Sequence, residues 1–274
     1  MDNLPTVQTN EFQPVVEQDS LMATEAMKGV AEVHGAIMMA KKYPRDQFTA
    51  FNNIMKACER KSLAESAVYA YPRGGQTVSG ASIRLAEAIA QVWGNISYGI
   101  RELSRDEHKS SCCSYAWDLE TNTRAERFFE VEHKRVTKER SYKLTDPRDI
   151  YENMANYGAR RLRACILEII PADITESAVN ACKKTLTSGK EPIIDRLRKM
   201  IVEFDKLGVK QTHIEKRLGH GIDATTADEI FDLLTVFNSL KDGHGKRSDY
   251  FDIAETEPTE KAKDLQEKLK KAGS

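Results

Sequence analysis

The chain has 274 residues, enough for one large or two ordinary domains. Hydrophobic residues make up 40% and charged residues 30%, a balance that excludes a largely disordered chain, and no run approaches the roughly 18 apolar residues of a membrane span. The first residues lack the basic start and apolar stretch of a secretory signal. We therefore expect a cytoplasmic protein that does not enter a membrane.

The formal net charge of -1 conceals a segregation of charge along the chain. Residues 183–217 are mainly basic, whereas residues 223–260 are mainly acidic. Residues 133–148 have only Glu139 and Asp146 as acidic residues against a basic set of Lys134, Arg135, Lys138, Arg140, Lys143 and Arg148. A basic middle indicates a site for a polyanion, and solvated surface charge is the ordinary alternative.

The five cysteines are odd in number and show no Cys-x-x-Cys spacing. A disulfide framework or a zinc site is therefore not expected. We predict reduced, mostly buried thiols.

The first half of the chain predicts helices followed by short strands. Residues 1–20 predict a flexible arm, and residues 21–61 predict two helices, the second capped by Asp46. Strands are expected at 67–71 and 76–79, around a turn at Arg73, and a helix at 79–93 ends at Gly94. Three further strands, at 95–103, 111–119 and 124–135, are expected to pair antiparallel.

The clearest helix signal covers residues 147–170, with Asp146 as N-cap, Pro147 at the first position and Pro171 as the stop. Its predicted apolar stripe contains Tyr151, Met154, Leu162, Cys165, Ile166 and Ile169. The opposite side carries Asn153, Asn156, Arg160 and Arg163, with Arg161 on the flank. Because arginines are costly to bury unpaired, at least two of these three arginines should reach the surface, to hold phosphates or to pair with Glu152 or other neighbours.

Helical patterns continue at 191–207, 210–218 and 226–240, and a Lys-rich helix is expected at 260–271. The predicted fold class is α+β, an antiparallel sheet with packed helices plus a small helical C-terminal module. The expected organisation is an arm at 1–20, a core at 21–188, a helical module at 189–241 and an acidic, polar tail at 242–274.

Three sequence patterns offer other chemistry. Residues 75–82 have the glycine spacing of a phosphate-binding loop, but Ala81 stands where that loop needs lysine, so ATP binding is not expected. Asp118, Glu132 and Lys134 loosely match an Mg²⁺-dependent nuclease, in which two carboxylates hold the metal and a lysine steadies the attacking water. Residues 208–219 resemble the start of a helix-turn-helix, which would indicate a duplex-binding regulator.

Four segments together resemble a known family. They are the strand AVYAYP, then Gly80 followed by IRLAEAIAQVWGNI, the strand pair SYAWDLETNTRAERFFEVEH, and the basic helix YENMANYGARRLRACILEIIP leading into ADITESAV. In this order they resemble the phage recombinases of the RecT and Red-beta superfamily, the single-strand annealing proteins. The resemblance covers somewhat over a hundred residues.

The resemblance implies an α+β core distantly like that of Rad52 and a function in annealing complementary strands during phage recombination. It implies homo-oligomers in the form of rings or filaments, and a function that needs neither ATP nor a bond-making step. Mg²⁺ is the only cofactor that we leave as an alternative. It also implies a bacterial host cell and a C-terminal module that binds a phage exonuclease or the host single-strand binding protein. The residues we expect to bind DNA are the polar and basic set Arg160, Arg161, Arg163, Asn153, Asn156, Lys134, Arg135, Lys138, Arg140, Lys143 and Arg73.

Overall fold

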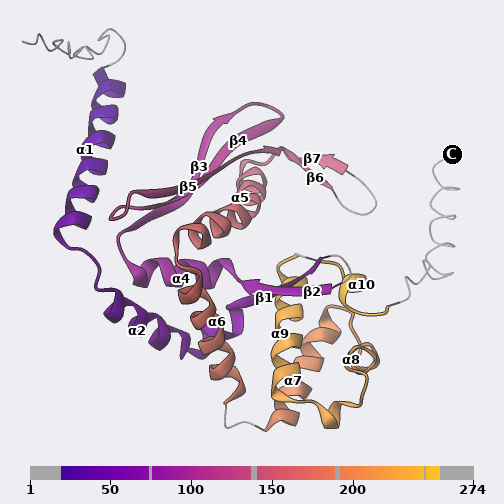
Figure 1. Cartoon of the computed structure of the whole chain (residues 1–274). Helices are drawn as coiled ribbons and strands as arrows, with labels where there is room; N and C mark the ends of the chain where they lie inside the picture. Colours follow the sequence, from indigo (N-terminus) through magenta and orange to yellow (C-terminus); the bar gives the residue numbers. More distant parts are fainter. Residues whose placement is uncertain (1–19, 74–75, 137–140, 189–191, 244, 254–274) are drawn as a thin grey trace, which may run out of the picture.

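The computed structural model describes residues 20–73, 76–136, 141–188, 192–243 and 245–253, and it has an α+β fold. A three-stranded antiparallel sheet lies against a long helix, and two smaller strand pairs and a cluster of C-terminal helices complete the molecule (Figure 1). The predicted fold class is therefore confirmed at this level.

From residue 20 on, where the described chain begins, three helices precede the first strand, whereas two were expected. They are α1 (Ser20–Lys42), α2 (Gln47–Cys58) and α3 (Lys61–Ser66). α1 ends shortly before Pro44, since the residue before a proline is biased away from helical backbone. Asp46 caps α2 as predicted, because its carboxylate accepts a hydrogen bond from the Phe48 amide. Phe48 itself is 75% exposed and lies outside the apolar face on which it was expected.

A hairpin follows, formed by β1 (Val68–Arg73) and β2 (Gln76–Ala81). Helix α4 (Ile83–Trp93) begins directly after it, capped by Ser82, whose hydroxyl accepts from the Leu85 amide. It ends at Gly94, where φ is +79°, a conformation that favours glycine. Residues 76–82, most of the segment with the glycine spacing of a phosphate-binding loop, therefore form strand β2 and the N-cap of α4.

The central sheet has the order β3 (Ile96–Arg105), β4 (Lys109–Asp118) and β5 (Thr123–Glu132). The last strand was expected to continue to residue 135, but it stops at His133, which is buried and lies 2.9 Å from the Ser110 hydroxyl through Nε2. Beyond it, β6 (Lys134–Val136) pairs with β7 (Ser141–Lys143) as a separate strand pair.

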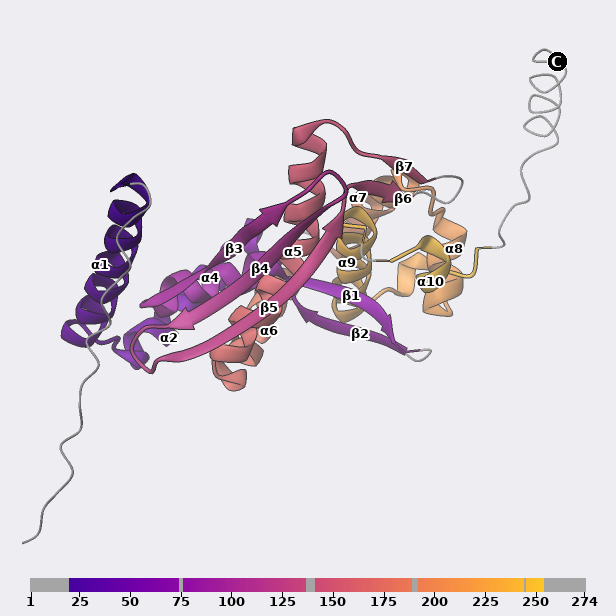
Figure 2. The same cartoon turned by 90° about the horizontal axis from the view of Figure 1, so that it is seen from above.

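Helix α5 (Pro147–Ile169) packs on one face of the central sheet (Figure 1). Viewed from above, the three strands lie in front of α4, α5 and α6 (Ala172–Thr187), so the described helices cover one sheet face only (Figure 2). Gly158 lets α5 approach closely, and its carbonyl accepts a 3.0 Å hydrogen bond from the Ser114 hydroxyl. Tyr151 was expected in the apolar stripe but is exposed, one turn before the first buried residue, Met154.

The C-terminal helices are α7 (Ile193–Lys206), α8 (Gln211–Leu218), α9 (Ala227–Lys241) and α10 (Arg247–Tyr250), with a 3-10 turn, η1 (Ile222–Ala224), before α9. They enclose a second core that also contains Ala70 of β1. The Ala70 amide donates to the Ser239 hydroxyl at 2.7 Å, and the Tyr250 hydroxyl donates to the Ala70 carbonyl at 2.8 Å. Packing thus joins the module to the hairpin and continues through Phe251, past the boundary expected at residue 241.

Candidate nucleic-acid interface

A groove of about 1040 Å³ runs along α5, between the sheet edge and the turn that follows α9. Its walls come from distant parts of the chain: β1, the start of α4, β5, α5 and the end of α9. Six of its lining residues are cations and one, Asp242, is a carboxylate. The cations are Arg84, Arg127, Arg160, Arg161, Arg163 and Lys241. This imbalance makes the groove attractive to a polyanion.

Three of these cations are the arginines predicted on the polar side of α5. Arg160 is exposed and donates to the Gly243 carbonyl at 3.3 Å. The guanidinium groups of Arg161 and Arg163 lie 4.3 Å from the ring centroids of Phe129 and Tyr69 respectively. Stacking on a ring fixes the plane of a guanidinium while its edge keeps donors for a phosphate.

Within the described part of the chain, none of the three arginines is ion-paired to a carboxylate. Glu152, the partner that a structural role predicts, is 3.0 Å from Arg148 instead. None of the three arginines is buried either, so the expectation that they reach the surface is confirmed.

The other three cations of the groove, Arg84, Arg127 and Lys241, were not among the residues predicted from the sequence. Arg84 pairs with Asp242 at 2.9 Å, and this hydrogen bond raises the pKa of the guanidinium. Arg127 pairs with Glu168, and Lys241 ends α9. They lie singly on α4, β5 and α9, so no local cluster of charge marks them in the sequence.

The structure divides the remaining predicted residues between two places. Asn156 lines the groove, whereas the Asn153 amide donates to the Glu132 carbonyl at 3.3 Å and ties α5 to the end of β5. Lys134, Arg135 and Lys143 lie on the β6–β7 pair.

This second basic region is partly neutralised. Lys134 pairs with Glu132, and Lys143 pairs with Glu107 at 2.6 Å, while Arg135 is exposed. Arg73 closes the β1–β2 hairpin opposite Gln76, and Lys138 and Arg140 lie outside the described residues. The α5 groove is therefore the stronger candidate for phosphate contacts.

The carboxylates of the nuclease hypothesis do not meet in this fold. Asp118 pairs with Thr123, and Lys109 with Glu132, so the two carboxylates lie at opposite ends of the β4–β5 ladder. Nine residues (118 − 109) at about 3.3 Å each separate them by roughly 30 Å. Asp118 is instead held 2.5 Å from the Arg45 guanidinium. In the parts of the chain that the structure describes, no three His, Cys, Asp or Glu side chains are grouped to hold a metal ion.

The helix-turn-helix hypothesis requires a helix with one free face. The second helix of such a motif would be α9, whose buried residues point in every direction around the axis: Ile230, Phe231, Leu233, Thr235, Val236 and Ser239. In α8, Ile214 is buried in the same core. These segments therefore pack as part of the C-terminal helical core.

The prediction of reduced, buried thiols is confirmed, since all five cysteines are free and buried. The strand-region aromatics divide between core and surface. Trp93 and Phe129 are buried, whereas Phe128 is 70% exposed on the sheet face away from α5.

A comparison of the chain with known protein families, with curated proteins and with solved structures finds no match. Among the described helices, none combines the length and the apolar character needed to cross a membrane.

Proposed function

We propose that the chain binds single-stranded DNA along the α5 groove and anneals complementary strands without hydrolysing a nucleotide. The observation that carries the proposal is the trio Arg160, Arg161 and Arg163, which have no carboxylate partner in the described chain and share one groove with three further cations. An arginine held by ring stacking rather than by an ion pair is available to a phosphate.

Annealing adds a requirement to binding, because the bases must stay accessible to an incoming strand. A groove that contacts the backbone through charge meets this requirement, since phosphate contacts carry no sequence information. The step forms no covalent bond, so the proposed protein needs no catalytic residue and no ATP, and Mg²⁺ would act only as a counterion. The resemblance to RecT and Red-beta proteins, with its distant Rad52-like core, supports the same proposal.

The resemblance also supports a setting for this activity. We place the protein in the cytoplasm of a bacterial host, as a homo-oligomer in phage recombination and repair. A phage exonuclease or the host single-strand binding protein is its proposed partner at the C-terminal helices.

The test removes two phosphate contacts. Changing Arg160 and Arg163 together to alanine should weaken the binding of every single-stranded sequence alike. It should also flatten the plot of log affinity against log salt by about 0.7 for each lost contact. The control is the pair Arg105→Ala and Arg198→Ala, which removes the same charge from an exposed strand residue and an exposed residue of α7, both outside the groove.

Binding is measured by fluorescence anisotropy of a labelled oligonucleotide at several salt concentrations, and annealing by pairing of two labelled complementary strands with and without ATP. A folded double variant that keeps the parental affinity and salt slope would show that these arginines are not at the DNA site. A strict ATP requirement would refute the annealing mechanism. Shortening of the labelled strand in Mg²⁺ would favour the nuclease.

A further inference from the structure

Helix α1 carries an apolar stripe that the described part of the chain leaves uncovered. Met22, Val30 and Val33 recur along one side of the helix, and their exposed fractions are 72%, 59% and 39%. Among the residues that the structure describes, contacts of α1 with the rest of the chain are at its C-terminal end: Ala40 is buried, and the Lys41 ammonium donates to the Glu120 carbonyl at 2.6 Å. A run of exposed apolar side chains of this length marks a contact surface.

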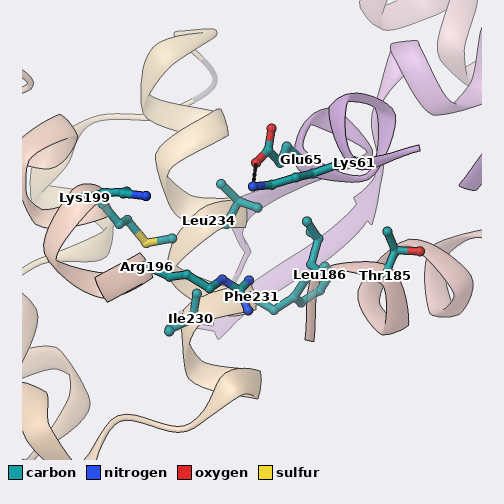
Figure 3. Close-up of a pocket in the computed structure, with 10 residues that line it drawn as sticks. Lys61, Glu65, Thr185, Leu186, Arg196, Lys199, Ile230, Phe231 and Leu234 are labelled. Carbon is teal, nitrogen blue, oxygen red and sulfur yellow. Dashed lines mark ion pairs between the residues drawn. The ribbon is translucent and has the colours of Figure 1, made fainter. Parts of the chain in front are cut away.

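An apolar cleft of about 360 Å³ lies among α3, α6, α7 and α9 (Figure 3). Its apolar lining includes Leu186, Phe231 and Leu234. Arg196 of α7 extends across the cleft toward Phe231, Lys199 lies one turn further along α7, and the ion pair of Lys61 with Glu65 lines the α3 side. Arg196 makes no ion pair within the described residues. The cleft therefore suits apolar side chains flanked by carboxylates.

Helix α1 has that chemistry. Glu25 and Glu32 lie seven residues apart on one side of the stripe, about 10 Å along the axis, and neither is ion-paired within the described chain. In both views α1 extends away from the rest of the molecule and lies apart from α6, α7 and α9, so the two surfaces of one chain are not in contact (Figures 1 and 2).

We propose that α1 of one copy lies in the α3–α6–α7–α9 cleft of a second copy, with Val30 and Val33 toward the apolar lining and Glu25 and Glu32 toward Arg196 and Lys199. Because the two surfaces differ, the contact is head-to-tail. Each added copy leaves one α1 and one cleft unfilled, so the contact propagates into a ring or a helical filament. The inference does not rest on the proposed nucleic-acid site, since none of these residues lines the α5 groove.

The test uses the full chain without nucleic acid, in sedimentation velocity over a concentration series. Wild type should form a concentration-dependent series of species. Val30→Asp should raise the dissociation constant by at least about tenfold, because it places a carboxylate against the apolar lining. Ala31→Asp is the matched control, since it adds the same charge at the adjacent residue, which faces away from the apolar stripe. Both positions are exposed, so both variants should fold.

A charge exchange identifies the acceptor. Arg196→Glu with Lys199→Glu should weaken association, as should Glu25→Lys with Glu32→Lys, and all four changes in one chain should restore it. Arg198→Glu, on the other side of α7, should leave association unchanged.

A wild-type chain that stays monomeric overturns the proposal, as does a Val30→Asp chain that associates like Ala31→Asp. If Val30→Asp is monomeric while the α7 reversal associates normally, α1 pairs with another surface, such as a second α1, and the cleft is not its acceptor. If both reversals weaken association and their combination does not restore it, the proposed charge contacts are wrong.

Discussion

Arg45 joins the segment between α1 and α2 to the turn between β4 and β5, and its replacement by alanine should destabilise the whole sheet. One guanidinium nitrogen lies 2.5 Å from the Asp118 carboxylate and another lies 2.9 Å from that of Glu120. The side chains are 7%, 4% and 15% exposed respectively, so water replaces little of the lost contact. The same guanidinium lies 5.2 Å from the Trp93 ring centroid.

Removing one partner of a buried ion pair typically costs about 3–5 kcal/mol, because the other charge stays buried and unpaired. Arg45→Ala leaves two carboxylates in that position, so we expect a loss of about 3 kcal/mol or more in the free energy of unfolding at neutral pH. Arg105→Ala is the matched control. It breaks an exposed pair with Glu102 at 2.7 Å and should cost less than about 1 kcal/mol.

The pH dependence separates lost charge pairing from lost packing. Burial raises the pKa of Glu120, but hydrogen bonds from Asn95 and Arg45 outweigh it and hold the pKa below its ordinary value. A lowered carboxyl pKa stabilises the folded state above the unfolded pKa of about 4.3, and this stability is lost as the pH falls through the folded pKa. In Arg45→Ala the lowering is reduced. The gap in stability between wild type and variant should therefore be largest near pH 7 and should shrink below about pH 4.

Urea unfolding followed by circular dichroism at a series of pH values measures this gap. If Arg45→Ala unfolds within 1 kcal/mol of wild type at pH 7, the ion pair does not stabilise the fold as argued. If the gap is large but independent of pH, the contact of the Arg45 guanidinium with the Trp93 ring explains the loss instead.

Two further substitutions test the close packing that shapes the groove. A Cβ at Gly158 would lie 2.6 Å from Ile100 Cδ1. Gly158→Ala should therefore cost about 1–3 kcal/mol in the free energy of unfolding through overpacking, offset by about 1 kcal/mol of gained helix propensity, and Ile100→Val should reduce that cost. A Gly158→Ala variant that melts at a higher temperature than wild type would contradict this packing. Ser239→Ala removes the hydrogen-bond acceptor of the buried Ala70 amide. It should lower the free energy of unfolding by about 1–3 kcal/mol and speed hydrogen exchange of the amides in β1. Unchanged exchange in β1 would show that α9 does not hold the hairpin in place.

Local rules predicted the starts and ends of the main elements well. Asp46 and Asp146 each accept a hydrogen bond from a backbone amide at a helix start, as predicted, and Gly94 ends α4 with a positive φ of +79°. These features depend on a few adjacent residues, so a single sequence contains all the information they need.

The composition of the groove could not be predicted in the same way. Arg160, Arg161 and Arg163 were visible because one helix carries them, whereas Arg84, Arg127 and Lys241 reach the groove through strand register and helix packing over distances of up to about 160 residues in the chain. The same register separates Asp118 from Glu132, although their residue types and short spacing predicted a shared metal site. The last strand ends before His133, whose buried ring is hydrogen-bonded to the Ser110 hydroxyl. This contact joins residues far apart in the sequence, so no local pattern predicts it.

The expected domain boundary near residue 189 has a consequence for the site itself. Arg84 belongs to the segment before that boundary, whereas its partner Asp242 and the Arg160 acceptor Gly243 come after it. One wall of the groove is therefore supplied by the helical module, and the module is fixed in place through Ala70. Because Asp242 and Gly243 follow α9, a displacement of α9 relative to β1 would change the spacing between the walls of the groove without altering the arginines of α5.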